Sequence, residues 1–219
     1  MEPRVRQFFR NSEKALADRT LQVALSRTTK TFLENRAAAV AEYPRFEGAR
    51  ERASRIRQEA LDNLDAHLAR FITEARKAGA VVHAARDGAE AREIAARIAR
   101  EEGVSLAVKS KSMVAEEVAL NEALEAAGIE VVETDLGEYI IQLAGEPPSH
   151  LIAPAIHKTR EEVSRLFEEK LGEPYTEEIS ALTRIARRRL WDKFFSAQMG
   201  ISGANFLCAD TGSVVLVTN

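Results

Sequence analysis

The sequence lacks several features that would each define a class of protein. Its 219 residues include a single cysteine, Cys208, which excludes an internal disulfide and a cluster held by several thiolates of this chain alone. No apolar run approaches the roughly 20 residues that span a bilayer, and the first ten residues contain no apolar signal-peptide core. We therefore expect a cytoplasmic protein without a membrane span.

A strong net charge and a nucleotide fingerprint are missing as well. The formal net charge is only -3, which gives no general attraction to nucleic acid. The arginines at 184 and 187–189 indicate the solvated face of an amphipathic helix rather than a nucleic-acid patch. No Gly-x-Gly-x-x-Gly motif is present, which argues against a nicotinamide site of the usual kind. Hydrophobic residues make up 45% and charged residues 30%, as in a folded globular protein.

The pattern of the chain changes near residue 79. Residues 1–78 predict a helical segment that packs on the rest, with one helix from Asn11-Ser12 to Tyr43 and a second over 49–77 that Gly79 ends. Residues 79–219 predict an α/β domain. Its strands, at 80–84, 104–108, 129–132 and 151–153, alternate with helices at 89–100, 113–127, 159–171 and 176–195. This alternation predicts a mostly parallel sheet flanked by helices, followed by a β-hairpin over 205–209 and 214–218.

Polar clusters follow three of these strands, at the edge where parallel sheets bind ligands. The first is Lys109-Ser110-Lys111-Ser112, between the strand 104–108 and the next helix. Free backbone N–H groups and the helix dipole favour an anion there, and two ammonium groups with two hydroxyls would complete a site for phosphate or a small carboxylate. The alternative is that Ser110 or Ser112 only caps the helix.

The second cluster is acidic and the third contains histidine. Glu133, Asp135 and Glu138 lie in a predicted loop after the strand 129–132. They would act as a base, ligate a divalent metal or pair with the lysines one strand away. The alternative for Asp135 is that it only caps the next turn. His157 lies beside Lys158 in a proline-flanked loop. It would act either as a base or as a structural hydrogen-bonding group. Its spacing from His150 is not that of a helical metal pair, and we predict no metal site.

Four further candidates border the first strand of the hairpin. Gly203 and Asn205 precede it, and Asp210 and Thr211 follow it. Turn chemistry accounts for the second pair but not for the first. We include all four in the candidate substrate- and anion-binding set.

Three longer motifs carry a resemblance to a known family. They are KSKSMVAEEVALNEAL, EVVETDLGEYIIQLAGEPPSHLIAPAIHKTREEV and GISGANFLCADTGSVVLVTN. With them, essentially the whole chain resembles the bacterial lactate-utilisation protein B family. The resemblance implies an N-terminal lactate-utilisation domain whose fold is similar to the sugar-phosphate isomerase and coenzyme-A transferase group. It also implies an iron–sulfur protein that works with two partner proteins, in the cytoplasm, to oxidise L-lactate to pyruvate.

The chain departs from that family at its end. It stops at Asn219, directly after a predicted strand and before any ferredoxin-like cysteine motif. We therefore expect a boundary inside a longer protein. On this interpretation the present segment holds no cofactor, and the 4Fe–4S clusters belong to the missing C-terminal part.

Three functional hypotheses follow. In the first, the chain is a substrate- or partner-binding domain of a lactate-oxidising complex and is inactive alone. The segment Lys109–Ser112 then holds the carboxylate of lactate or pyruvate, and Glu133, Asp135, Glu138 or His157 accepts the hydroxyl proton. The second, from fold analogy alone, is an enzyme acting on a phosphorylated sugar or coenzyme-A ester. The third is a non-enzymatic assembly module that docks partner subunits through its N-terminal helices and the helix of Arg184 to Arg189.

Overall fold

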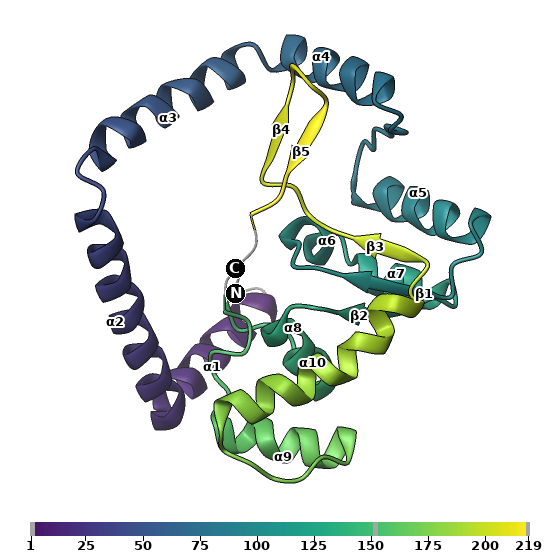
Figure 1. Cartoon of the computed structure of the whole chain (residues 1–219). Helices are drawn as coiled ribbons and strands as arrows, with labels where there is room; N and C mark the ends of the chain where they lie inside the picture. The colour runs from purple at the N-terminus through teal and green to yellow at the C-terminus, as the bar shows by residue number, and fades with distance from the viewer. Residues whose placement is uncertain (1–2, 151–152, 218–219) are drawn as a thin grey trace. The chain divides into compact units, whose positions relative to one another are not determined.

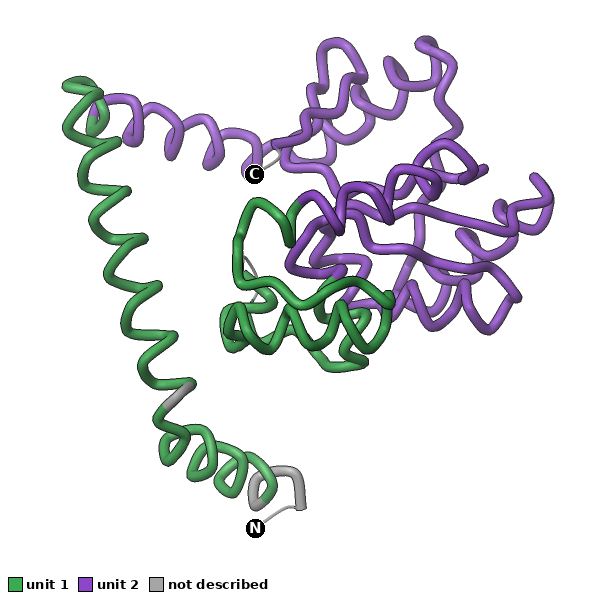
Figure 2. The backbone as a smooth tube through the Cα atoms, turned by 60° about the horizontal axis from the view of Figure 1, so that its bottom comes forward, with its two compact units in different colours: residues 1–47, 140–183 green, residues 48–139, 184–219 purple. Residues whose placement is uncertain are grey.

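A computed structural model of the protein describes residues 3–150 and 153–217. The chain divides into two compact units (Figure 2). One contains residues 1–47 and 140–183, and the other contains residues 48–139 and 184–219. The strands of the described residues all belong to the second unit.

The first third of the described chain is helical, as predicted, but in four pieces. They are α1 (Pro3–Ala17), α2 (Arg19–Ala41), α3 (Phe46–Asp62) and α4 (Leu64–Lys77). The predicted N-cap at Asn11-Ser12 is wrong, because both residues lie inside α1. Asp18 is the cap that separates α1 from α2, and its carboxylate accepts a hydrogen bond from Leu21 N–H at 3.0 Å. Gly79 follows α4 with φ 94°, the left-handed conformation predicted for it.

A parallel three-stranded sheet forms the centre of the second unit (Figure 1). It consists of β1 (Leu106–Lys109), β2 (Glu130–Glu133) and β3 (Met199–Ile201), in the order β2-β1-β3. The prediction of a parallel sheet is confirmed. The predicted strand 80–84 is wrong, because this segment pairs with no described strand and Val81 is 80% exposed. In the predicted strand 151–153, residues 151 and 152 lie outside the described residues.

Two helices, α5 (Gly88–Glu101) and α7 (Leu120–Ala126), pack with this sheet and form its apolar core. The short helix α6 (Met113–Glu117) contacts α7. Ala99 of α5, Ala107 of β1 and Leu124 of α7 are fully buried in one apolar cluster. The predicted continuous helix 113–127 is wrong, because Ala119 adopts a left-handed φ of 54° and separates α6 from α7. Such a conformation costs a residue with a Cβ about 1–3 kcal/mol.

The remaining helices are α8 (Leu136–Ala144), α9 (Arg160–Leu171) and α10 (Ile179–Ser196). Thr159 and Glu162 form a capping box at the start of α9, and Gly172 ends it in the left-handed conformation. Along α10 the apolar side chains of Leu182, Ile185, Ala186 and Leu190 are buried while its arginines are exposed. The amphipathic helix predicted around Arg184 and Arg187–Arg189 is therefore confirmed.

An antiparallel hairpin of β4 (Phe206–Cys208) and β5 (Ser213–Val215) completes the described chain, as predicted. The hairpin tip meets α4 (Figure 1), where Asp210 Oδ1 lies 2.9 Å from Arg70 Nη1. Gly212 has φ 68°, and a Cβ there would lie 2.2 Å from Ala75 N, so this position requires glycine. The α/β class with N-terminal helices and a C-terminal hairpin is thus confirmed. Within residues 3–150 and 153–217, none of the helices combines the length with the apolar character that a membrane span requires.

Candidate functional site

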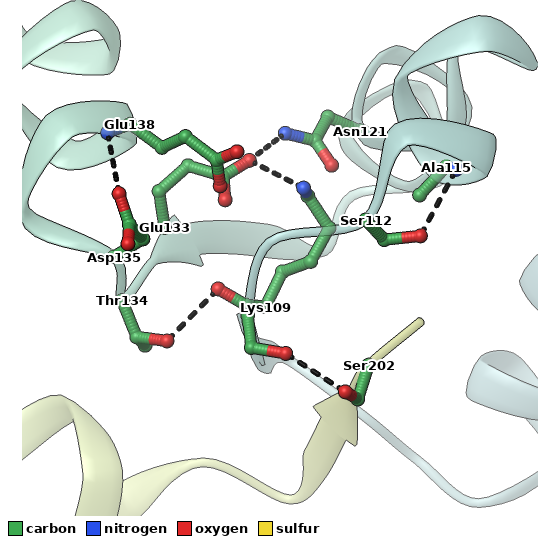
Figure 3. A network of polar contacts seen from close by, with 10 residues as sticks. Lys109, Ser112, Ala115, Asn121, Glu133, Thr134, Asp135, Glu138 and Ser202 are labelled. Carbon is green, nitrogen blue, oxygen red and sulfur yellow. Dashed lines mark hydrogen bonds and ion pairs between the residues drawn. The ribbon is translucent and has the colours of Figure 1, made fainter. Parts of the chain in front are cut away.

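The neighbouring strands β1 and β2 end in a buried ion pair. Lys109 and Glu133 are the last residues of β1 and β2 and face each other in the parallel register. Lys109 Nζ lies 2.9 Å from Glu133 Oε1, and the two side chains are 0% and 7% exposed. The pairing that the sequence predicted for neighbouring strand ends is present (Figure 3).

A second carboxyl group joins this pair from the first turn of α8. Burial, followed by the negative charge and hydrogen bonding of Glu133, raises the pKa of Glu138 to about 8 against the opposing charge of Lys109. Glu138 therefore keeps its proton at neutral pH and lies beside the ionised Glu133 (Figure 3). One ammonium, one carboxylate and one carboxylic acid leave the buried group with no net charge.

Asn121 completes the buried centre, which we define as Lys109, Asn121, Glu133 and Glu138. Its Nδ2 donates to Glu133 Oε1 at 2.7 Å. Within the described part of the chain, Asn121 Oδ1 and Glu138 Oε2 are buried without a hydrogen-bond partner, and Lys109 Nζ has only its ion pair. Buried polar atoms of this kind usually have partners. The buried centre therefore offers donors and acceptors to a small polar ligand.

The rest of the first polar cluster faces the loop after β3. Ser110 Oγ donates to Ser202 Oγ at 2.9 Å. Ser112 caps α6 by accepting a hydrogen bond from Ala115 N–H at 3.2 Å. Helix capping was the alternative to an anion site in the sequence analysis. A Cβ on Gly203 would lie 3.1 Å from Ser112 Oγ, so Gly203 is brought against this cluster. Lys111, which lies between these two serines in the sequence, is half-buried.

Two expectations about helix starts change in the structure. The helix that follows Ser112 has only five residues, so the dipole expected to favour an anion is short. The acidic cluster is not a loop, because α8 begins at Leu136. Asp135 caps it by accepting from Gly137 N–H at 3.0 Å, and this cap brings Glu138 to Glu133.

The hairpin candidates make contacts of their own. Asn205 Oδ1 accepts from Val217 N–H at 2.8 Å, and Thr211 Oγ1 donates to Ser213 Oγ at 2.9 Å. Asp210 pairs with α4, as described above. The structure therefore places Asn205, Asp210 and Thr211 in contacts within the hairpin and with α4, whereas Gly203 lies at the strand ends.

His157 belongs to the other compact unit, on the loop between α8 and α9. Its Nε2 lies 2.9 Å from Glu146 Oε2 and its Nδ1 contacts Ser149 Oγ. Lys158 Nζ reaches the other oxygen of Glu146 at 2.5 Å. Hydrogen bonds from Lys158 and then from His157 hold the pKa of Glu146 below its usual range. Residues 3–150 and 153–217 hold no group of three histidine, cysteine or acidic side chains suited to a metal ion.

Sequence reasoning missed four residues that contact the predicted ones: Asn121 beside Glu133, Glu146 and Ser149 beside His157, and Ser202 beside Ser110. Asn121 was one polar residue in a predicted helix, and only the break at Ala119 turns the chain so that it reaches Glu133. Glu146 and Ser149 follow Gly145 in a segment without periodicity. No local signal in the sequence distinguishes them.

Comparison with known proteins identifies the family. The LUD domain family profile matches residues 68–219. The chain is 41% identical over 204 residues to proteins named lactate utilization protein B from two Bacillus cereus strains and from Bacillus thuringiensis. These alignments cover 93% of this chain and 43% of each relative, so the chain spans less than half the length of the relatives it matches. No solved structure matches. On the profile match over residues 68–219, the chain belongs to the LUD domain family.

Proposed function

We propose that this chain is the substrate- or partner-binding domain of a cytoplasmic iron–sulfur protein in a system that oxidises L-lactate to pyruvate. Two observations support the proposal. The relatives are named for lactate utilization, and the buried centre holds a carboxylic acid whose pKa is raised to about 8. The second observation carries the chemistry, because acid–base groups work best when their pKa lies near the working pH.

The reaction requires a group that takes the proton of the lactate hydroxyl. Glu133 and Glu138 lie together and hold one proton between them at neutral pH, so the pair can accept a proton at one carboxyl and release it at the other. Lys109 stabilises the ionised form of the pair through its 2.9 Å contact. We assign proton transfer to these two glutamates and a positioning role to Asp135, which caps α8 below Glu138.

The substrate carboxylate needs a positive group and hydrogen-bond donors. We assign it chiefly to Lys111 with the hydroxyls of Ser110 and Ser112, in the polar segment that follows β1. Gly203 lies against Ser112 and lets the backbone approach closely there. A carboxylate that accepts hydrogen bonds from an ammonium and hydroxyls is well satisfied.

The described residues do not fit an iron–sulfur cluster. Such clusters take several cysteine thiolates, and Cys208 is the only cysteine. Electron removal from lactate therefore needs another part of a longer protein or a partner subunit, and no step of it is assigned to this chain.

Calorimetric titration of the chain with L-lactate and with pyruvate tests the proposal. We expect binding of both acids, and Lys111→Met should weaken it by roughly 10-fold or more, the value of one charge-assisted contact. Lys77→Met is the matched control, because Lys77 pairs with Glu74 near the end of α4 and its side chain is 66% exposed, so its loss should leave the affinity unchanged. No detectable binding, or equal affinity for Lys111→Met, would contradict the proposal.

A role as an assembly module is supported by one observation. The hairpin exposes apolar side chains on both strands, including Phe206 at 59% and Val214 at 52%, and such surfaces often serve contacts with other proteins. If assembly is the whole function, partner subunits should still co-purify with a Lys111→Met, Glu138→Gln variant, while Phe206→Ser should release them.

A further inference from the structure

A second polar centre lies on the loop between α8 and α9, within the unit that contains residues 140–183. The loop starts at Gly145, whose φ of 66° ends α8, and it closes where Ser149 N–H donates to Pro154 O at 3.0 Å. It brings together a carboxylate, an imidazole, a hydroxyl and an ammonium group. These four groups, Glu146, His157, Ser149 and Lys158, are called the loop centre below.

The imidazole of His157 stands between the carboxylate and the hydroxyl. Its Nε2 lies 2.9 Å from Glu146 Oε2, and its Nδ1 contacts Ser149 Oγ. A carboxylate can only accept, so the ring proton is on Nε2 and Nδ1 accepts from the hydroxyl of Ser149. Ser149 is exposed, whereas the side chain of His157 is 20% exposed. The line of hydrogen bonds therefore ends at a hydroxyl that faces solvent.

Lys158 favours the ionised form of Glu146, which orients the ring of His157. Its Nζ lies 2.5 Å from Glu146 Oε1, and hydrogen bonds from Lys158 and His157 lower the pKa of Glu146. An ionised carboxylate fixes the tautomer of the ring and stabilises the imidazolium that forms when the ring takes a proton. The Glu146–Lys158 pair alone would be enough to hold the loop closed. It does not account for the hydroxyl aligned on the opposite ring nitrogen.

We propose that the loop centre is an acyl-transfer site in which Ser149 is the nucleophile and His157 the general base. Glu146 orients His157, and Lys158 positions Glu146. The ring is used in the opposite sense to the common serine-hydrolase triad, in which Nδ1 faces the carboxylate. Either nitrogen can accept a proton while the other donates. This activity is separate from the lactate binding proposed above and does not depend on it.

The substrate class is a small activated ester or thioester. Ser149 Oγ attacks the carbonyl carbon while its proton passes to His157 Nδ1, and the bond from that carbon to the leaving oxygen or sulfur breaks. The leaving group takes the proton from His157. Water then attacks the acyl-serine ester, again giving a proton to His157, which returns it to Ser149 as the carboxylic acid leaves and ionises in solvent. No electrons are exchanged with another molecule.

Labelling of the whole chain with a fluorophosphonate probe, which reacts with activated serines, tests this site. We expect one adduct, which peptide mass spectrometry should place on Ser149 and which Ser149→Ala should abolish. His157→Gln should slow labelling by roughly 10²-fold or more, the usual contribution of a general base. Glu146→Gln should slow it by a smaller factor, because the base remains but is no longer oriented.

Ser180→Ala is the matched control. The hydroxyl of Ser180 also donates to a carboxylate, that of Glu178, but the bond runs directly and without a histidine. This variant should label at Ser149 as the wild type does. Circular dichroism separates loss of fold from loss of reactivity in every variant. Absence of a Ser149 adduct in the wild type, or wild-type rates in folded His157→Gln or folded Glu146→Gln, would overturn the proposal.

Discussion

Each of the two polar centres contains a lysine–glutamate ion pair, but the centres differ in burial, and the pKa of a glutamate shifts upward in one and downward in the other. The side chain of Lys109 is 0% exposed, whereas that of Glu146 is 40% exposed. In the buried centre the pKa of Glu138 rises to about 8 although a lysine is close. In the loop centre hydrogen bonds from Lys158 and His157 lower the pKa of Glu146.

Desolvation explains the reversal. Removing a carboxylate from water costs more than one nearby ammonium returns when a second carboxylate shares that ammonium. Glu138 is therefore protonated at neutral pH, whereas the lowered pKa of Glu146 favours its ionised form. A lysine beside a glutamate does not by itself indicate which form the glutamate takes, because solvent access and the number of neighbouring carboxyls decide it.

The largest expected effect is on stability after loss of the buried ammonium. Lys109→Met keeps the length of the side chain but leaves Glu133 buried without its counter-charge, which costs about 3–5 kcal/mol in comparable cases. Lys158→Met removes the matching ammonium of the loop centre and should cost at most about 1 kcal/mol. Urea unfolding at pH 7 measures both. Equal losses would show that the two centres do not differ in burial as described.

The next effect is a dependence of stability on pH that Glu138 controls. Its pKa is about 8 in the folded protein and 4.5 ordinarily, so the folded state binds this proton more tightly. The resulting stabilisation is fully present below pH 4.5 and is lost as the pH rises toward 8. One proton changes the free energy of unfolding by about 1.4 kcal/mol per pH unit.

Glu138→Gln isolates this contribution, because glutamine mimics the protonated acid and does not titrate. Between pH 6 and pH 9 the wild type should lose about 2–3 kcal/mol more than Glu138→Gln, measured by urea unfolding at each pH. Parallel pH profiles of the two proteins would mean that Glu138 is ionised at neutral pH.

The buried centre was partly predictable from the sequence. Alternating strands and helices predict a parallel sheet, and in such a sheet the ends of neighbouring strands meet, so the contact between Lys109 and Glu133 follows from the order of the elements. The helical first third and the hairpin follow from periodicity and turn residues. These features depend on local patterns.

The rest depends on contacts that no local pattern contains. Strand β3 has three residues with Gly200 at its centre, too short for an alternation, and it forms only because β1 offers an edge. Asn121 reaches the site through a left-handed alanine, a conformation that alanine does not favour. Gly137 breaks the helical pattern after Asp135, so the sequence predicts a loop where α8 begins.

A smaller effect should appear at low pH and only in the loop centre. Because the pKa of Glu146 is lowered on folding, its stabilising contribution is present above its ordinary value of 4.5 and is lost as the pH falls below it. Glu146→Gln should therefore destabilise the protein slightly at pH 6 and by less at pH 3, the opposite trend to Glu138. Thermal unfolding at the two pH values measures this, and a loss that grows toward pH 3 would contradict it.

The smallest expected effect is the response of the two ion pairs to salt. Screening acts over about 10 Å at 0.1 M ionic strength and about 3 Å at 1 M, but it needs ions near the charges. The coupling energy between Lys158 and Glu146, from a double-mutant cycle with Met and Gln, should fall from roughly 0.5 kcal/mol to near zero in 1 M NaCl. The coupling between Lys109 and Glu133 should hardly change, because no ion reaches a pair that is 0% and 7% exposed. That second cycle is best measured in a Glu138→Gln background, so that Glu138 cannot ionise in place of Glu133. Equal salt sensitivity of both couplings would mean that water and ions enter the buried centre.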